Sequence, residues 1–342
     1  MAKSVRLADI AKQVGVSAVT VSKALSGQKG VSEEMRQKIV ALADELGYKQ
    51  PSAVKKQEAV GKSYNIAVLI HEKYLDKYNS FYMLLYQNLA AHAISSGSIT
   101  LMEVVTDEAE SSCKVPMVLQ ENKADGLVLM GKFRMEYLNA IHANAQVPYI
   151  YLDDNGARVD YDSVISDSFY GAYYLTNYLF EMGHTQIGFV GNVMSTGSIT
   201  DRYLGYVKSL MEHGIEVEKR WVIEDRNDEI GVMYTADELK LPKTLPTAFL
   251  CNCDLAASVI IKRLENDGYV VPDDFSVVGY DNFLYPGICD VPLTTYEVDM
   301  TEMASKCLRI LLKKMAGLEY KKGANIVEGR LVIRDSVKKI SE

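Results

Sequence analysis

Polar side chains follow several apolar runs of the sequence at the point where each run ends. Asp153 and Asp154 follow the run VPYIYL, Asn252 follows PTAFLC, and Asp281 follows FSVVGY. Carboxylates and amides can exchange hydrogen bonds with vicinal hydroxyls, which is what a site for a polyol such as a sugar needs. Arg202 lies at the start of a predicted helix, and the N–H donors of its guanidinium can bind hydroxyls, a carboxylate or a phosphate.

The runs that end in these residues belong to a regular alternation of short apolar stretches and amphipathic segments after residue 63. The expected strands are 64–70, 98–104, 125–130, 147–153, 186–191, 246–251 and 275–281, and the expected helices include 80–96, 168–183, 200–213, 253–267 and 299–316. Strands that alternate with helices predict parallel sheets covered on both faces. Seven such units favour two sheets over one, and ligands in these folds bind beyond the carboxyl ends of the strands.

The first 50 residues have a different pattern, which predicts three helices. Leu7, Ile10, Ala11 and Val14 lie on one stripe of the first helix, and Gly15 suits its end. Ser17 can cap a second helix that turns Val21, Ala24 and Leu25 inward. Ser32 can cap a third, which buries Met35, Ile39, Leu42, Ala43 and Leu46. Two short helices around a tight turn, with a third in support, are typical of a helix-turn-helix unit whose second helix enters the DNA major groove. A purely structural helical hairpin is the alternative.

The charge distribution agrees with a nucleic-acid-binding segment at the N-terminus. The whole chain has a net charge of -8, but residues 1–62 carry eleven Lys or Arg against six Asp or Glu, and the remainder carries 26 against 39. A basic head on an acidic body predicts that only the head binds a polyanion. Candidates for phosphate contacts are Lys3, Arg6, Lys12, Lys23, Lys29 and Lys38.

Composition and motifs weigh against several other classes of protein. No run of 18 apolar residues or export signal occurs. The five cysteines are an odd number and include no C-x-x-C motif or Cys/His cluster at zinc spacing, so we expect a cytoplasmic protein with reduced thiols and no metal or cofactor. The catalytic signatures G-x-S-x-G, H-E-x-x-H, G-x-G-x-x-G and the P-loop are missing. His184, between a helix and a strand, is expected to make a local backbone bond. An enzyme or a simple sugar-binding module is therefore a minor alternative.

The segments LADIAKQVGVSAVTVSKALSG and VSEEMRQKIVALADELGY closely resemble the DNA-binding domain of the lac/galactose repressor family of bacterial regulators. The resemblance continues through YIYLD, EMGHTQIGFVGN, DRYLGYVKSL, FLCNCDLAA, SVVGYDN and PLTTYEVD. It implies a helix-turn-helix head (1–50), a hinge (51–62) and a two-lobed effector and dimerisation domain (63–342) with a periplasmic-binding-protein-like fold. Lobe one is expected at about 63–161 and 293–322, and lobe two at about 162–292 and 323–342.

The resemblance also implies which residues of the head contact DNA. Ala18, Val19 and Lys23 fall at the base-reading positions, so we expect apolar contacts with thymine methyl groups and one polar reader. The full expected set of DNA-contacting residues is Leu7, Ser17, Ala18, Val19, Thr20, Ser22, Lys23, Lys29 and Tyr48.

The linker departs from the family pattern. Members have a hinge helix whose leucine wedges into the minor groove, but here Glu58 occupies that position when the segments are aligned from Pro51. A carboxylate would not enter a minor groove. Val54 or Val60 could act instead, the DNA could be read without strong kinking, or the linker could be simply flexible.

The effector-contacting residues implied by the resemblance are Asp153, Arg202, Asn252 and Asp281, with Phe81 near the mouth of the pocket. Cys253 replaces the family's usual acidic residue after Asn252. We therefore expect a homodimeric repressor whose operator affinity is controlled by a small molecule, with a sugar favoured. A nucleoside or purine, or a phosphoprotein partner, are the alternatives.

Overall fold

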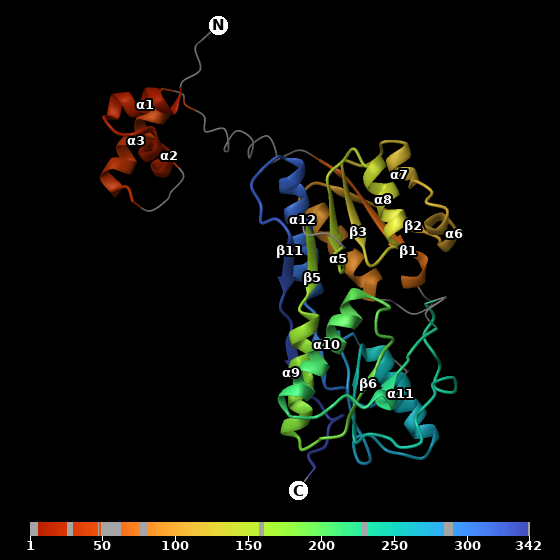
Figure 1. The fold of residues 1–342 in the computed structure, drawn as a ribbon. Helices are drawn as coiled ribbons and strands as arrows, with labels where there is room; N and C mark the ends of the chain where they lie inside the picture. The colour runs from red at the N-terminus through yellow and green to blue at the C-terminus, as the bar shows by residue number, and fades with distance from the viewer. Residues whose placement is uncertain are drawn as a thin grey trace. The chain divides into compact units, whose positions relative to one another are not determined.

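The computed structural model describes residues 6–25, 30–46, 48, 63–75, 81–156, 161–227, 231–283 and 290–340. The chain divides into two compact units, one made by residues 1–62 with 316–318 and the other by 63–315 and 319–342. We call residues 1–62 the head and residues 63–342 the body, and describe each by itself (Figure 1).

The head contains the three predicted helices, α1 (Leu7–Val14), α2 (Ala18–Leu25) and α3 (Glu33–Glu45). The stripes read from the sequence meet in one small core, in which Ile10, Val21 and Ile39 are fully buried. Gly15 ends α1 in the left-handed conformation with φ 74°, which glycine adopts without a Cβ clash. The Ser17 hydroxyl accepts the amide of Thr20 at 3.1 Å and so caps α2.

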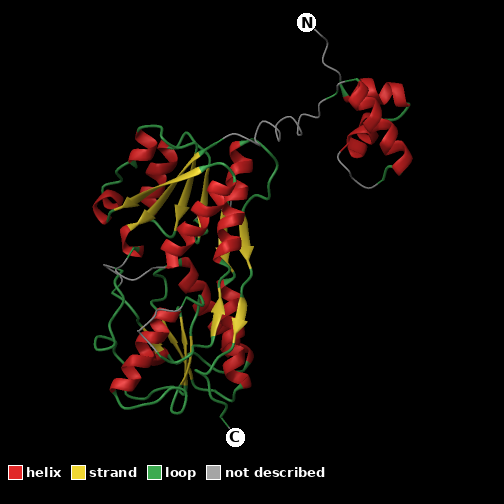
Figure 2. Ribbon diagram, turned by 180° about the vertical axis from the view of Figure 1, so that it is seen from behind, coloured by secondary structure: helices red, strands yellow, loops and turns green. Residues whose placement is uncertain are grey.

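Lobe one of the body is built on a six-stranded parallel sheet in the order β11-β5-β4-β3-β1-β2. Its strands are β1 (Asn65–His71), β2 (Ile99–Val105), β3 (Gly126–Met130), β4 (Tyr149–Leu152), β5 (Ser163–Ser166) and β11 (Ala324–Val327). Its helical segments are η1 (Glu72–Tyr74), α5 (Phe81–Ser95), α6 (Asp107–Ser111), α7 (Met117–Gln120), α8 (Met135–Asn144) and α12 (Met300–Met315). Figure 2 shows helices on both faces of this sheet.

Alternate residues of β1 explain why both faces are covered. Ile66, Val68 and Ile70 pack in one core with α5 and α12, whereas Ala67 and Leu69 pack in a second core with α8. The strand is apolar on both sides because neither face meets water.

Lobe two repeats the design with a four-stranded parallel sheet in the order β7-β6-β8-β9. Its strands are β6 (Ile187–Val190), β7 (Val222–Ile223), β8 (Ala248–Cys251) and β9 (Ser276–Val278). Its helices are α9 (Ser168–Glu181), α10 (Gly197–Glu212) and α11 (Asp254–Asn266), with η2 (Lys219–Trp221) before β7. An antiparallel pair, β10 (Thr295–Glu297) and β12 (Arg330–Val332), lies in the segments that connect the lobes. The prediction of two parallel sheets is confirmed.

The crossings between the lobes lie later in the chain than predicted. Strands β5 and β11 pair with each other inside the sheet of lobe one. The first crossing therefore follows residue 166 and the last follows residue 327, not residues 161 and 322. Both strands, SVIS and ANIV, have no more than two apolar residues in a row, so they lack the apolar run that marks the predicted strands.

Candidate functional site

The outer face of α2 presents the side chains that the sequence assigns to base reading. Ala18, Val19 and Lys23 are exposed, and Val19 keeps 65% of its surface accessible. Val21 and Ala24, on the opposite side of the same helix, are buried in the head core. The helix therefore holds two small apolar groups and one long cationic side chain toward solvent on a rigid support.

The other residues predicted to contact DNA differ in their exposure, and some lie outside the described residues. Leu7 and Tyr48 are half-buried and pack against the head core, and Thr20 shares a hydroxyl contact of 2.9 Å with Ser17. Ser22 is half-buried. Lys29, Lys3 and the hinge with Val54, Glu58 and Val60 lie outside the described residues. Arg6, Lys12 and Lys38 are exposed, and Lys38 pairs with Glu34 at 3.0 Å.

All five predicted effector residues line one cavity of about 130 Å³ in the body. Phe81 and Asp153 come from lobe one, and the other three come from lobe two. The full lining is Lys73, Tyr74, Phe81, Tyr82, Asp153, Thr196, Ser198, Ile199, Arg202, Arg226, Gly231, Met233, Asn252, Cys253, Leu255 and Asp281. The fold thus brings together Asp153, Asn252 and Asp281, which the strand-end argument indicated, and Phe81 and Arg202, which the resemblance implied.

Arg202 lies near the centre of this arrangement. It projects from the second turn of α10, whose N-terminus is capped by the Thr196 hydroxyl through the amide of Ile199 at 3.1 Å. One guanidinium nitrogen lies 3.0 Å from the Asp281 carboxylate, another donates to the Asn252 carbonyl, and the group stacks 3.8 Å from the centre of the Tyr280 ring. Its Nε is buried without a hydrogen-bond partner among the described residues.

The two cavity carboxyls have pKa values displaced in the same direction. Burial raises the pKa of Asp153 to about 7, although Tyr82 donates its hydroxyl to this carboxyl at 2.8 Å. Burial also raises the pKa of Asp281 to about 6, against the stabilising charge of Arg202. Near neutral pH Asp153 can therefore serve as donor or acceptor to a hydroxyl, whereas Asp281 mainly accepts.

The side chain of Asn252 is already engaged inside the protein. Its Nδ2 donates to the Val190 carbonyl at 3.0 Å and to Asp225 at 2.7 Å, and its Oδ1 faces Arg226 at 3.3 Å. Asp225 in turn binds Arg226 through two contacts of 3.0 and 2.7 Å and accepts the amide of Asn192 at 3.0 Å. Burial would raise the pKa of Asp225, but Arg226 and these hydrogen bonds hold it below its usual value. Asn252 thus helps to hold Arg226 at the cavity wall.

Several lining residues were not found from the sequence. Lys73 and Tyr74 follow β1 directly, so the strand-end rule applied to this strand would have indicated them. Arg226 follows β7, which has two residues and leaves no recognisable pattern. Asp254 also follows a strand, but its carboxylate has a structural role. It accepts hydrogen bonds from the Thr295 hydroxyl at 2.7 Å and from the amide of Phe283 at 2.8 Å.

His184 has a structural role, with partners other than the expected local backbone group. Its ring nitrogens contact the Thr247 hydroxyl at 2.9 Å and the Ser276 hydroxyl at 2.8 Å, and Nε2 also lies 3.2 Å from the Lys338 carbonyl. The ring ties together segments distant in sequence, which sequence periodicity cannot show.

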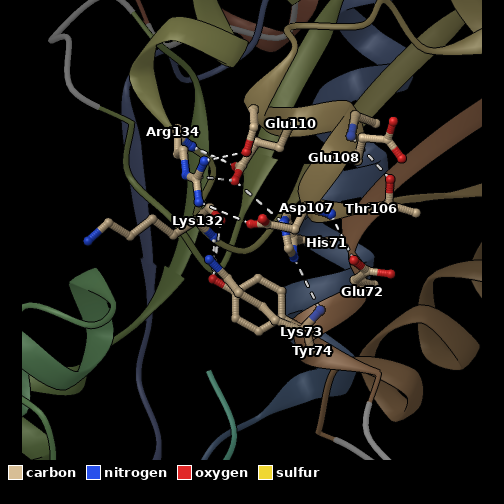
Figure 3. Close-up of polar contacts among 12 residues, drawn as sticks. His71, Glu72, Lys73, Tyr74, Thr106, Asp107, Glu108, Glu110, Lys132 and Arg134 are labelled. Atoms are coloured by element: carbon tan, nitrogen blue, oxygen red, sulfur yellow. Dashed lines mark hydrogen bonds and ion pairs between the residues drawn. The ribbon is translucent and has the colours of Figure 1, made fainter. Parts of the chain in front are cut away.

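A possible metal-binding group lies just beyond the cavity, at His71, Asp107 and Glu110, whose ligand atoms are within 4.8 Å of one another. Figure 3 shows why it resembles an internal ion-pair network more than a metal site. His71 Nδ1 accepts the Lys73 amide at 3.1 Å, and the other ring nitrogen, Nε2, faces Glu110 at 3.4 Å. The Arg134 guanidinium forms ion pairs with both carboxylates, at 3.0 Å from Asp107 and 3.2 Å from Glu110.

Comparisons with known proteins agree with both units. Residues 6–51 match the model of bacterial regulatory proteins of the lacI family, and residues 176–337 match a periplasmic binding protein-like domain. The chain is 27% identical to the HTH-type transcriptional repressor PurR of Vibrio campbellii over 334 residues, 97% of this chain and 98% of that one. No helix among the residues that the structure describes is both long and apolar enough to cross a membrane.

Solved structures show the same fold. The complex of the transcriptional regulator CelR with cellobiose gives a TM-score of 0.67 at 21% identity, covering 97% of this chain and 99% of that chain. The lac repressor dimer bound to operator and the anti-inducer ONPF gives 0.66 at 24% identity, covering 98% and 100%. The chain therefore combines a DNA-binding domain of the lacI family in its head with a periplasmic-binding-protein-like domain in its body, and it aligns over nearly its whole length with a transcriptional repressor.

Proposed function

We propose that this protein is a cytoplasmic repressor whose affinity for its operator is controlled by a small molecule bound between the two lobes of the body. The proposal is carried by the convergence of the five predicted effector residues on one cavity: Phe81, Asp153, Arg202, Asn252 and Asp281. The same chain exposes the side chains of α2 that are predicted to contact DNA bases, and we call α2 the reading helix. The protein acts by binding and has no catalytic step of its own.

The head supports sequence-specific binding by a homodimer. One helix-turn-helix reads only a few base pairs, so useful specificity requires two heads on a pseudo-palindromic site. Ala18 and Val19 have no hydrogen-bonding side-chain groups and suit thymine methyls, whereas Lys23 can reach a guanine edge. The operator is therefore expected to combine these two features in each half-site.

The cavity favours a carbohydrate as the ligand. Asp153, Asp281 and Arg202 supply acceptors and donors for hydroxyls, and Phe81, Tyr74 and Tyr82 supply an aromatic wall for the apolar face of a sugar ring. The related CelR structure contains cellobiose, although its 21% identity carries only the fold to this chain. The same aromatic wall could stack on a nucleobase, so a nucleoside is the second candidate.

A contact between the lobes offers a route from the cavity to the heads. Lys132, after β3 of lobe one, donates to the carbonyls of Met194 at 2.8 Å and Ser195 at 3.4 Å in lobe two. A ligand that contacts both lobes changes the balance between lobe arrangements by its difference in affinity for them. In a dimer, that change alters the spacing of the two heads.

The test begins with selection of a binding site from random duplex DNA by the full-length protein. Operator affinity is then measured by fluorescence anisotropy in the presence of sugars and nucleosides, while the compounds are checked for chemical turnover. We expect one sugar to change operator affinity without being consumed. Consumption of the effective compound would contradict the assignment as a regulator only, and a response to nucleosides alone would replace the sugar.

Variants of α10 connect the response to the cavity. Arg202→Ala is expected to keep operator binding and to lose the response to the sugar. Lys208→Ala, on the same helix but in a surface pair with Glu212, is the matched control and should respond normally. A normal dose response of Arg202→Ala would remove Arg202 from the site.

A further inference from the structure

We infer that the effector is a small sugar derivative with an acidic group, a carboxylate or a phosphate, and that Lys73 receives this group. The inference rests on the proposed function, since it assumes that the cavity is the effector site. It goes further by naming the charge of the ligand and the residue that selects it.

Among the described residues, the charges that line the cavity do not balance. Arg202 is paired with Asp281 at 3.0 Å, and Arg226 is paired with Asp225 at 2.7 Å. Lys73 lines the same cavity and has no ion-pair partner in the described part of the chain. The remaining cavity carboxyl, Asp153, does not offset it fully near neutral pH, because burial raises the pKa of Asp153 to about 7.

The backbone of Lys73 is held firmly at the end of β1. Its amide donates to His71 Nδ1, and the His71 ring faces Glu110, which Arg134 binds through its guanidinium and, at 2.8 Å, its backbone amide (Figure 3). Within this network the buried Glu110 carboxylate is bound by His71 and Arg134. The network fixes the start of the Lys73 side chain, and none of its carboxylates forms an ion pair with the Lys73 ammonium.

The side chain of Lys73 reaches the wall formed by lobe two. A Cβ placed on Gly231 would lie 3.3 Å from the Lys73 Cβ and 3.6 Å from its Cδ, so the aliphatic stem packs against this glycine. The ammonium lies 5.1 Å from the centre of the Tyr74 ring. Lys73 therefore spans the interface of the lobes beside the cavity.

The surroundings of Lys73 disfavour its charge in the absence of an anion. Burial is the main cause that lowers its pKa; Glu110 opposes the shift, and Lys132 and Arg134 add to it. A ligand anion beside Lys73 would supply the missing opposite charge, which favours the protonated amine and binding together.

Two further features of the cavity suit an anionic or strongly polar ligand. Thr196, Ser198 and Ile199 line it at the N-terminus of α10, a helix of 16 residues whose positive dipole end favours negative charge. Arg202 contributes a buried Nε that has no hydrogen-bond partner among the described residues. The volume of about 130 Å³ lies well below the roughly 300 Å³ at which drug-sized pockets begin, which favours a single sugar ring.

The experiment is calorimetric titration of the full-length protein with matched sets of sugars. Each set contains a neutral sugar, its uronate and its 6-phosphate, for example glucose, glucuronate and glucose 6-phosphate, with the corresponding galactose and mannose sets. We expect one acidic member to bind at least about ten-fold tighter than its neutral parent, the scale of a charge-assisted hydrogen bond. Comparison of uronate with phosphate identifies which acid the site takes.

Two variants assign the preference to Lys73. Lys73→Met keeps the stem and should lose about ten-fold or more of the affinity for the acidic ligand, with little change for the neutral parent. Lys73→Arg keeps the charge and should keep the preference. Lys132→Met removes a nearby cation that does not line the cavity, and should change the affinities for acidic and neutral members by equal factors.

The outcomes separate this inference from the proposed function. Tight binding of a neutral sugar that equals or exceeds its acidic relatives would overturn the acidic ligand and leave the sugar-responsive repressor standing. An acid preference unchanged in Lys73→Met would overturn the role of Lys73. Failure of every member to bind, with operator binding intact, would remove the acidic sugar together with the sugar assignment.

Discussion

Helix α2 of the head and the cavity of the body present their proposed functional side chains in opposite ways. Val19 is 65% exposed and Lys23 is exposed on a helix whose other face forms the core. In the cavity, Arg202 and Asp281 are 5% and 9% exposed and are already bonded to each other. In the head, one face of α2 is proposed to bind DNA and the opposite face stabilises the fold. In the cavity, the same charged side chains are proposed to bind the ligand and also stabilise the fold.

This difference predicts that substitutions near the cavity should destabilise the protein far more than substitutions on the reading face. The strongest expected effect is at Asp225, which is 2% exposed and bonded to Arg226, Asn252 and Asn192. Asp225→Ala leaves Arg226 without its carboxylate and should lower the free energy of unfolding by about 3–5 kcal/mol. Urea unfolding followed by the fluorescence of Trp221, the sole tryptophan of the chain, measures the loss.

The control for this variant is an ion pair at the surface. Lys262 and Glu265 lie 3.1 Å apart with 55% and 41% of their side chains exposed, and Lys262→Ala should cost less than about 1 kcal/mol. Equal effects of the two variants would contradict the view that buried charge pairs stabilise the cavity wall.

The second expected effect is a dependence of stability on pH that originates in the cavity. Burial raises the pKa of Asp153 from its ordinary value of 3.8 to about 7 in the folded protein. The folded state therefore holds a proton that the unfolded state releases, and this contribution to stability is full below pH 4 and is lost as the pH rises to 7. Relative to Asp153→Asn, the wild-type protein should lose up to about 4 kcal/mol over this range.

Unfolding of both proteins at pH values from 4 to 8 tests this prediction. A constant difference between wild type and Asp153→Asn over that range would show that the carboxyl has an ordinary pKa in the folded protein.

The third expected effect is on DNA affinity with unchanged stability. Lys23→Ala should weaken binding to the operator by about 1–3 kcal/mol and affect random DNA much less, because a base contact is lost. Lys12→Ala, an exposed cation on α1, should weaken binding to both DNAs and reduce the salt slope by about 1. Equal losses on operator and random DNA for Lys23→Ala would count against base reading by this residue.

The smallest expected effect is at Val19. Val19→Ala removes an exposed side chain, so the stability of the head should change by less than about 0.5 kcal/mol. Operator affinity should fall modestly, by about 1 kcal/mol, through the loss of contact with a thymine methyl group. A large loss of stability, measured by thermal unfolding of the full-length protein, would show that the two faces of α2 are not independent.

The same contrast explains how far the sequence predicted the structure. The head helices, seven of the parallel strands and the residues Asp153, Arg202 and Asp281 were found because local patterns and the resemblance both mark them, and Phe81 was found from the resemblance alone. Periodicity works where one face of an element is buried over several residues.

Features that depend on contacts between distant segments were missed. Strands β5 and β11, SVIS and ANIV, have no more than two apolar residues in a row and so lack the apolar run that marks the predicted strands, and Arg226 follows a strand of two residues. Asn252 was correctly placed at the cavity, but its amide is occupied by Val190 and Asp225, which are 62 and 27 residues away in the chain. No local pattern reveals how a polar side chain is shared among such partners.

The pairing of β5 with β11 also bears on how the chain folds during synthesis. The head has all its helices once residue 45 has been made, and its core involves only local contacts. Lobe one, by contrast, leaves the edge of β5 unpaired until residues 324–327 have emerged, near the end of the 342-residue chain. An unpaired edge is a site for aggregation, and pairing over such a sequence distance is slow. A growing chain therefore has a completed DNA-binding head well before its ligand-binding body can close, and truncation before residue 324 leaves lobe one without its final strand.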